Sequence, residues 1–564
     1  TANTTGTGNT VVGKEAAVAN TTAANNTIVG FEAFGTNTTG HSNVAIGKAT
    51  MYGNTTGDLN TAAGYAALSG NTTADNNTAF GAYALQVNTT GTDNVALGAL
   101  ALDANTTASF NTAVGKSALS ANTTGASNVA VGNKALLVAT TAAGNVAVGP
   151  GAMAATTTGA TNTAIGNEAL DANTTGASNV AVGHLSLGAN TTASSNTAVG
   201  TSALTANTTG TQNVAVGMNT MRDNTTGLSN SALGEGAFIT NTTGSYNTAI
   251  GRLSLFLNTT ASNNTALGFS ALYANTTGAI NTGIGYQSLY SNTTGYQNTA
   301  IGGASAYSNT TGFFNAALGQ AALYSNTTGD NNTALGIYAL NGNTTADNNT
   351  AVGKSALFAN TTGTRNDAFG YQAGTALTTG AYNTFIGERA GTSQTTASEN
   401  TAVGSASLSA NTTGTGLVAM GKNALAANTG SNNTAVGSRS LTTNTTGASN
   451  TAVGKDSYAN CSTGHSNCGL GFEAGQAITT GAENVHIGYR AGDHSVGHAT
   501  GSRCVIIGAY ADTTTTGATD AQVIGQDVSG QGGYTTLGSG TADIRAQNGV
   551  ATWATVSDER YKKD

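Results

Sequence analysis

The chain has 564 residues, only 8% of them charged, and its 18 Lys and Arg against 26 Asp and Glu give a formal net charge of −8. Ordinary globular proteins carry about 25% charged residues. A nucleic-acid surface needs clustered Lys and Arg, so this composition argues against a nucleic-acid partner. The longest apolar stretch, around Cys504–Ala511, is interrupted by Gly508 and falls short of the roughly 18 residues of a membrane helix. We therefore expect no membrane insertion.

A short repeat fills most of the chain. The Gly that closes each Asn-Thr-Ala-Val-Gly phrase recurs every 17 residues from Gly13 to Gly421, then at Gly437, one residue early, and later at Gly508, three residues late. The unit reads N-T-A-V-G-x-x-A-L-x-A-N-T-T-G-x-x. We call one repeat a coil and number its residues 1–17 from the first Asn. Because a regular repeat indicates one repetitive architecture, several separate globular domains are excluded.

The unit predicts an all-β fold. Its apolar phrases are too short for helices, and Asn-Thr-Thr-Gly is a turn signal. We expect a strand at Asn-Thr-Ala-Val, a corner at Gly, a second short strand at Ala-Leu and a turn at Asn-Thr-Thr-Gly. Successive coils would pair in parallel and in register, so that Asn stacks on Asn. This predicts a parallel β-solenoid, or β-roll, of about 31 coils over residues 1–525, with a neck at 526–556 where the period fails.

The strand pattern also predicts association between chains. We expect the residue before the Gly (Val, Ile, Leu or Phe), and the one two places earlier, to face the interior of the coil. The Ala between them would then point outward, yet it stays small and apolar almost throughout. An outward position that stays apolar indicates a second packed surface, and a 17-residue coil encloses little core alone. We therefore expect bundled chains, most simply three.

Several phrases resemble known fibres. The phrase Asn-Thr-Ala-Val-Gly-x-x-Ala-Leu is similar to the coil phrase of trimeric autotransporter adhesin heads, which are trimers of parallel β-rolls. Residues 285–295 and 487–492 (Ile-Gly-Tyr-Arg-Ala-Gly) look like phage tail-fibre and bacterial fibre proteins. The resemblance implies an extracellular homotrimer on a virion tail or cell surface. Its partners would be a baseplate or surface anchor and a glycan or protein of the host cell.

The last residues carry a second resemblance. Val-Ser-Asp-Glu-Arg-Tyr-Lys-Lys-Asp (556–564) resembles the opening of the endosialidase-type intramolecular chaperone domain. In that family the domain trimerises, guides folding of the fibre before it and then cuts itself off at the Ser-Asp junction. This implies a processing junction at Ser557–Asp558, the only chemistry that we expect. An unprocessed chain and a merely solvated charged end stay open as alternatives.

An aromatic row breaks the monotony of the repeat. Position 10 is usually small or polar, as in Ser120, Asp171 and Thr205. It becomes aromatic in a run of later coils, at Phe256, Tyr273, Tyr290, Tyr307, Tyr324 and Phe358. Residues 17 apart should stack as a ladder on one side of the solenoid. Two interpretations stay open: a glycan or surface contact, and a stacking ladder that stabilises the shaft or fills a gap between chains.

Few other residues carry chemistry. Asp493, His494 and His498 lie in the only three-residue insertion, which we expect to be an exposed loop and not a metal site. Cys461 and Cys468 are expected to be buried thiols and not a disulfide. No paired carboxylates, catalytic triad or zinc motif is seen, so we expect no cofactor and no active site. The expected function is a structural and adhesive fibre. The alternatives are a polysaccharide-degrading tailspike enzyme and an ice-binding solenoid.

Overall fold

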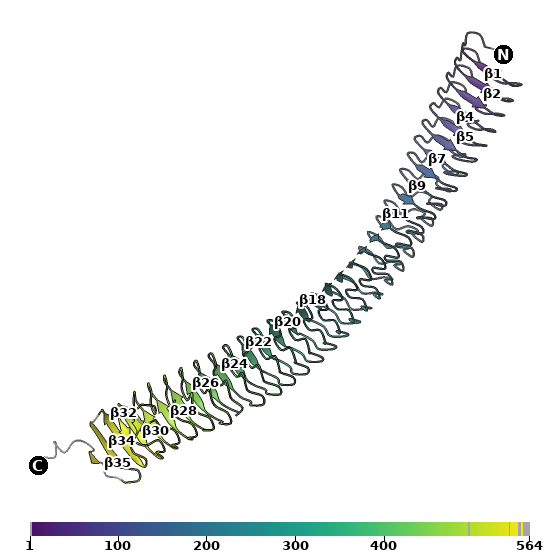
Figure 1. Cartoon of the computed structure of the whole chain (residues 1–564). Coiled ribbons are helices and arrows are strands. Elements are labelled where there is room, and N and C mark those ends of the chain that lie inside the picture. The colour runs from purple at the N-terminus through teal and green to yellow at the C-terminus, as the bar shows by residue number, and fades with distance from the viewer. Residues whose placement is uncertain (1–2, 495–496, 541, 551–553, 556–564) are drawn as a thin grey trace. The chain divides into compact units, whose positions relative to one another are not determined.

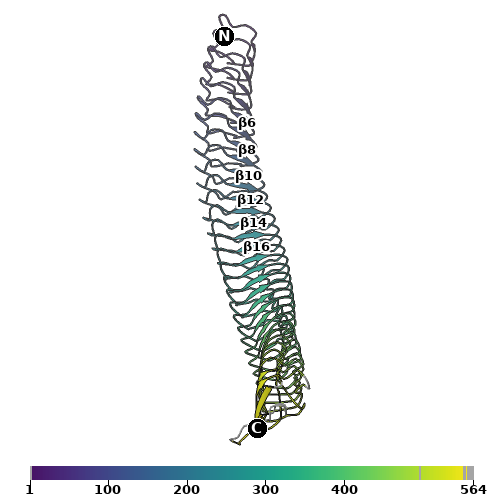
Figure 2. The same ribbon diagram turned by 90° about the vertical axis from the view of Figure 1, so that its left-hand side faces the viewer.

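The structure, a computed structural model, describes residues 3–494, 497–540, 542–550 and 554–555. These residues form an all-β parallel solenoid of about 31 turns without a helix, as expected. The chain divides into two compact units, Thr1–Asn281 and Thr282–Asp564. Within each unit, one short strand per coil stacks edge to edge on the strands of the neighbouring coils (Figures 1 and 2).

The N-terminal unit contributes sixteen strands of three residues each. They are β1 (Thr10–Val12), β2 (Thr27–Val29), β3 (Val44–Ile46), β4 (Thr61–Ala63), β5 (Thr78–Phe80), β6 (Val95–Leu97), β7 (Thr112–Val114), β8 (Val129–Val131), β9 (Val146–Val148), β10 (Thr163–Ile165), β11 (Val180–Val182), β12 (Thr197–Val199), β13 (Val214–Val216), β14 (Ser231–Leu233), β15 (Thr248–Ile250) and β16 (Thr265–Leu267).

The C-terminal unit continues the pattern and then changes it. Its three-residue strands are β17 (Thr282–Ile284), β18 (Thr299–Ile301), β19 (Ala316–Leu318), β20 (Thr333–Leu335), β21 (Thr350–Val352), β22 (Asp367–Phe369), β23 (Thr384–Ile386), β24 (Thr401–Val403), β25 (Val418–Met420), β26 (Thr434–Val436), β27 (Thr451–Val453), β28 (Cys468–Leu470), β29 (Val485–Ile487) and β30 (Val505–Ile507). The last strands are β31 (Asp512–Thr513), β32 (Gln522–Gln526), β33 (Ser529–Gly530), β34 (Tyr534–Ser539), β35 (Ala542–Gln547) and β36 (Ala554–Thr555).

The strands pair in parallel and in register, as the constant spacing predicted. Ala113 of β7 lies opposite Ala130 of β8, which in turn lies opposite Ala147 of β9. In-register pairing brings identical side chains about 4.7–4.9 Å apart. Both Asn positions of the coil use this spacing to form buried ladders.

The first ladder, at position 1, ties side chain to backbone. The Asn128 Oδ1 atom accepts the backbone N–H of Asn145 at 3.0 Å, and the Asn128 amide donates to the Ala142 carbonyl at 2.9 Å. The second ladder, at position 12, joins amide to amide. The Asn122 side chain donates to Asn105 Oδ1 at 2.9 Å and to the Gly125 carbonyl at 3.0 Å. The predicted Asn stacking is therefore confirmed.

The predicted orientation of the strands was wrong. The central Ala of each strand points into the coil, as Ala113 and Ala198 show, both of which are fully buried. The residue before the Gly faces outward, and Leu233 and Leu470 are 49% and 50% exposed. The reason is volume: the fully buried Leu at position 9 shares the interior with position 3, which leaves room for little more than a methyl group there.

Exceptions in the core show this exchange of volume. At position 3 of one coil, Phe385 replaces Ala and is fully buried. Gly374 and Gly391 replace Leu at position 9 on either side of it, and a Cβ atom on either glycine would lie within 2.6 Å of the Phe385 ring. In these coils, the large ring at position 3 thus occupies the space that the Leu side chains at position 9 fill elsewhere.

The predicted second strand at Ala-Leu is also absent. Positions 7 and 9 have left-handed backbone, with φ of 57° at Ser117 and 51° at Leu119. Such a backbone cannot extend into a strand. The corner at position 5 needs Gly, because Gly115 has φ of 133° and a Cβ atom there would lie 2.5 Å from the Gly132 carbonyl oxygen. The coil thus has one strand, and turns and bends form the rest.

The solenoid ends in antiparallel strands. β32 pairs in parallel with β34, and β34 then pairs antiparallel with β35, which pairs antiparallel with β36. A parallel edge is thus covered by a hairpin within the segment that was predicted to be a neck. Covering an edge removes a template for unwanted strand pairing.

The corrected orientation predicts a contrast between neighbouring residues. Replacing Ala198 by Leu should overpack the interior of the coil and lower the local free energy of unfolding by about 1–3 kcal/mol. Replacing the adjacent outward-facing Val199 by Thr should change it by no more than about 0.5 kcal/mol. Hydrogen exchange of the amides of β11–β13 in the intact chain measures both. Equal effects of the two substitutions would contradict the orientation described here.

Candidate functional site

The predicted aromatic ladder is present in both units. In the N-terminal unit, Phe256 and Tyr273 stack with ring centroids 5.1 Å apart and an interplanar angle of 2°. In the C-terminal unit, Tyr307 stacks between Tyr290 and Tyr324, with centroid distances of 5.1 and 5.2 Å. The sixth predicted member, Phe358, is 41% exposed and instead meets Tyr338 edge-on at 6.3 Å.

Stacking limits what this ladder offers to a ligand. Where rings stack in parallel, each covers the face of its neighbour, so an enclosed ring such as Tyr307 presents its edge and hydroxyl outward. Burial between neighbours raises the pKa of Tyr307, and Tyr290 and Tyr324 raise it further. A sugar ring packs on an aromatic face, and these faces are already occupied. The geometry therefore favours a stabilising role for the enclosed rings.

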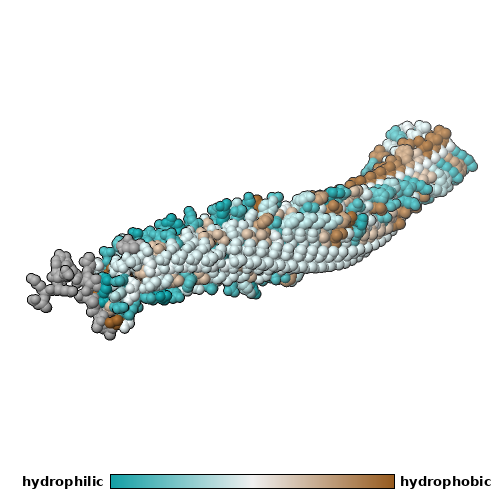
Figure 3. Space-filling view, turned by 60° about the horizontal axis from the view of Figure 1, so that its bottom comes forward, coloured by the Kyte–Doolittle hydropathy of each residue, from teal (hydrophilic) through white to brown (hydrophobic). Residues whose placement is uncertain are grey.

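A second surface feature is an apolar row on the outer face of the sheet. It consists of the residue before each phased Gly, and its most exposed members include Ile46, Phe80, Leu233, Leu318, Leu335, Met420 and Leu470. Ile301, Leu318 and Leu335 line a shallow hollow of about 260 Å³ on the strands β18–β20. Runs of brown apolar side chains lie on an otherwise pale or teal surface in Figure 3. Exposed apolar patches of this kind mark interaction surfaces.

The Thr pairs form a different surface. The hydroxyl of the first Thr, at position 13, donates to a carbonyl of the next coil, as Thr123 does to Thr140 at 3.1 Å. The second Thr, represented by Thr124, is exposed. In most pairs, as in this one, only the second Thr is exposed, whereas an ice-binding array needs two on one face.

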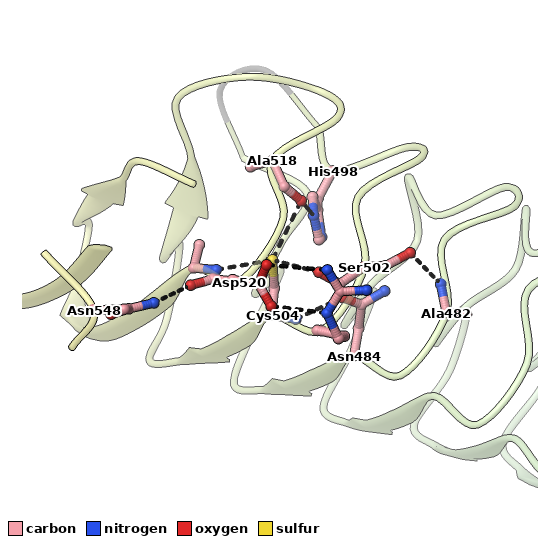
Figure 4. A network of polar contacts seen from close by, with 10 residues as sticks. Ala482, Asn484, His498, Ser502, Cys504, Ala518, Asp520 and Asn548 are labelled. Carbon is pink, nitrogen blue, oxygen red and sulfur yellow. Dashed lines mark hydrogen bonds and ion pairs between the residues drawn. The ribbon is translucent and has the colours of Figure 1, made fainter. Parts of the chain in front are cut away.

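Sequence reasoning missed a buried polar chain in the C-terminal unit. Tyr458 Oη lies 2.6 Å from His486 Nδ1, and His486 Nε2 lies 3.3 Å from His498 Nδ1. At the end of this chain, His498 Nε2 lies 2.9 Å from the Ala518 carbonyl oxygen (Figure 4). All three side chains are fully buried. The sequence signal was there: Gly469, Gly475 and Gly492 replace larger residues around the Tyr458 and His486 rings.

The hydrogen bonds of this chain have one consistent direction. A carbonyl only accepts, so His498 Nε2 carries a hydrogen, and the Nδ1 atom of the neutral ring accepts from His486 Nε2. His486 Nδ1 then accepts from the Tyr458 hydroxyl. Burial lowers the pKa of His486 well below its usual value, with His498 adding to the effect, and burial also lowers the pKa of His498. Both rings are therefore neutral in the folded state near pH 7.

The insertion that carries His498 is anchored to the core and is not simply an exposed loop. The buried Asp512 accepts backbone N–H groups from His494 at 3.1 Å and Gly497 at 3.2 Å. His494 is exposed, and Asp493 lies 3.5 Å from Arg490. The expectation of an exposed loop is thus wrong for His498, which takes the buried place of an Asn at position 12.

The three cysteines are free thiols. Cys461 is buried, and burial raises its pKa to about 11, which disfavours the reactive thiolate. Cys468 is exposed on β28, so its predicted burial was wrong. Cys504 is buried at position 1, where its sulfur accepts the Ala521 N–H in place of an Asn oxygen.

The remaining predictions concern a processing junction, metal sites and membrane helices. The junction Ser557–Asp558 lies outside the described residues. No group of three or more His, Cys, Asp or Glu that could hold a metal ion occurs in the part of the chain that the structure describes. The same part contains no helix long and apolar enough to cross a membrane.

Comparison with protein-family models, with curated proteins and with solved structures finds no match to this chain.

Proposed function

We propose that this chain is the shaft of an extracellular attachment fibre, in which three copies associate and hold a recognition surface away from a virion tail or a cell surface. The single observation that carries the proposal is the apolar row on the outer face of the sheet. A chain with 8% charged residues that repeats an outward Val, Ile or Leu in nearly every coil has a surface suited to association.

The repeat also favours a partner of the same kind. Apolar side chains recur on this face once per coil, so a partner must present side chains at the same spacing to fill the gaps between them. A further copy of the chain does so along the whole row. This argument replaces the one from the strand Ala, which the structure places in the core. The number three, the attachment role and the self-cleaving chaperone rest on the resemblances of the sequence.

The first test is the solution mass of the intact chain, by light scattering after size-exclusion chromatography. A trimer of 55.2 kDa chains is expected, and a 55.2 kDa monomer would overturn the proposal. A variant then locates the interface. Replacing Ile301, Leu318 and Leu335 together by Lys should weaken the trimer and lower the mass at micromolar concentration.

The matched control places the same charges on another face. Position 14 is exposed in the same three coils, where it holds Thr311, Thr328 and Thr345. Replacing these residues by Lys introduces the same repulsion between charges stacked on consecutive coils. This control should keep the mass of the wild type. Dissociation of both variants, or of the control alone, would show that the apolar row is not the interface.

A further inference from the structure

A groove of about 400 Å³ crosses the first coils of the N-terminal unit. It is lined by Glu32, Ala49, Tyr52, Ala66, Ser69, Gly70, Gln86 and Val87. These residues come from four consecutive coils, so the groove runs along the stacking direction over about 14 Å. Its volume lies within the range of about 300–1,000 Å³ that is typical of ligand sites.

The groove exists because two coils carry small residues where their neighbours carry large ones. At position 7 the successive residues are Glu32, Ala49, Ala66 and Tyr83, so the two alanines form a floor between larger side chains. At position 11, glycines replace side chains at two successive coils, Gly53 and Gly70. The groove is therefore a local gap in an otherwise filled surface.

Tyr52 differs from the aromatic residues of the ladder. It occupies the same position 10, but its neighbours there are Gly35 and Ser69, and its ring packs against Gly35. No other aromatic ring stacks on it among the described residues, and 47% of its surface is exposed. Its ring thus borders the groove without the covering neighbours that close the faces of Tyr307.

Polar groups surround this ring. Glu32 contributes a carboxylate at one end of the groove, Gln86 contributes an amide at the other, and Ser69 a hydroxyl between them. The carboxylate accepts two or more hydrogen bonds, and the amide both donates and accepts. An apolar ring face beside such groups matches a pyranose, whose C–H face is apolar and whose hydroxyls point outward. Grooves with an apolar wall and a few convergent polar groups are typical ligand sites.

We infer that this groove binds a neutral saccharide of two or three pyranose units, with one sugar ring packed on Tyr52 and its hydroxyls bonded to Glu32 and Gln86. Glu32 disfavours anionic sugars, because the carboxylate repels a like charge in the groove. The inference rests on the proposed function and names the chemistry of the surface that the fibre would contact. Glycoside hydrolysis commonly needs two carboxylates, and Glu32 is the only one that lines this groove, so the site binds without cleaving.

Saturation-transfer NMR on the intact chain tests the inference, with lactose, cellobiose, maltotriose, mannotriose and chitotriose as probes and 3′-sialyllactose as the anionic counterpart of lactose. At least one neutral probe should bind, and 3′-sialyllactose should not. Two variants should each weaken that binding at least about tenfold. Tyr52→Ala removes the aromatic ring on which the sugar would pack. Ala66→Tyr places a large side chain at the base of the groove.

The second variant is designed to fold. Position 7 of the next coil is Tyr83, whose φ of 62° is close to the 54° of Ala66, so the backbone already accepts Tyr in this conformation. The matched control is Tyr290→Ala, which opens the aromatic ladder and should leave binding unchanged.

Three outcomes overturn the inference. Binding of none of the neutral probes excludes a neutral saccharide site, and stronger binding of 3′-sialyllactose than of lactose excludes the assigned role of Glu32. Binding that survives Tyr52→Ala but is lost in Tyr290→Ala places the site on the ladder. The association of chains is measured separately by solution mass, so failure of this inference and failure of the proposed trimer can be told apart.

Discussion

Lowering the pH from 7.5 to 5 should destabilise the coils around Tyr458, His486 and His498. In the folded state both histidines are neutral, with pKa values below the ordinary 6.5. The unfolded chain therefore binds more protons as the pH falls below about 6.5. The stabilisation is fully present above that pH and is lost as the pH falls toward the folded-state pKa values. Each histidine contributes about 1.4 kcal/mol per pH unit in that window.

Hydrogen bonding makes the effect severe. Protonating His498 adds a hydrogen to Nδ1, which then faces the N–H of His486 Nε2. Protonating His486 at Nδ1 removes the acceptor of the Tyr458 hydroxyl, whose hydrogen is left with the Asn484 carbonyl oxygen at 3.4 Å. Asp512 raises the pKa of His498, and so does the bond to Ala518, but burial outweighs both. Hydrogen exchange of β28–β30 at pH 7.5 and 5 measures the local loss of stability.

A matched variant removes the titration. Phe385 lies at position 3 between two glycines, as His486 does, so His486→Phe fills the same kind of space. Combined with Tyr458→Phe and His498→Asn, it leaves no titrating group in this chain of hydrogen bonds. We expect the variant to lose most of the difference between the two pH values in the local free energy of opening, which is obtained after division by the intrinsic exchange rate at each pH. An unchanged difference would show that other groups cause the acid sensitivity.

Replacing Asn128 by Leu should be far more damaging than replacing Asn122 by Leu, although both side chains are fully buried. Asn128→Leu leaves the Asn145 N–H without its acceptor and the Ala142 carbonyl without its side-chain donor. Each buried backbone group left unsatisfied costs about 1–3 kcal/mol. At Asn122, Oδ1 already has no partner, so less is lost when the amide is removed.

The chain itself supports this contrast. Position 12 also holds Ala139, Leu377 and Ile478, all fully buried. Position 1 holds Asn in nearly every coil. Of its exceptions, Cys504 keeps a sulfur acceptor for the next N–H (Figure 4), Leu417 begins the coil that is one residue short, and Ala521 begins the last repeat. Hydrogen exchange of the amides of β8 and β9 gives the local free energy of unfolding of each variant. The midpoint of the loss of β-sheet circular dichroism on heating gives a second comparison. Similar destabilisation by both would show that burial matters at these positions and not the bond to the backbone.

The register of the solenoid was predictable from the sequence, but the orientation of its strands was not. A constant step of 17 can be satisfied only by coils that stack in register. In a strand of three residues, however, the alternation of side chains is compatible with either orientation of the strand. The prediction that Val114 faces inward was based on the size of its side chain alone. The deciding information was the pairing of Phe385 with Gly374 and Gly391, which is visible in the sequence and reveals that positions 3 and 9 share one space.

The candidate sites were predictable to different degrees. The ladder followed from residues 17 apart, since repetition places them side by side. The chain of Tyr458, His486 and His498 joins position 9 of one coil to positions 3 and 12 of a later coil, and no spacing rule brings these together. The groove at Tyr52 depends on the lack of side chains at Gly53 and Gly70. Two such glycines do not stand out in a sequence that contains 78 glycines.

The two irregular coils show where this architecture tolerates a change of length. Val485 still pairs with Val505 across an insertion of three residues, and Val418 with Thr434 across a coil that is one residue short. The insertion falls between positions 9 and 12, and the deletion between position 12 and the next Asn. Both changes thus lie away from the strand. The turns that follow position 9 therefore absorb changes of chain length, while the strand and its register stay fixed.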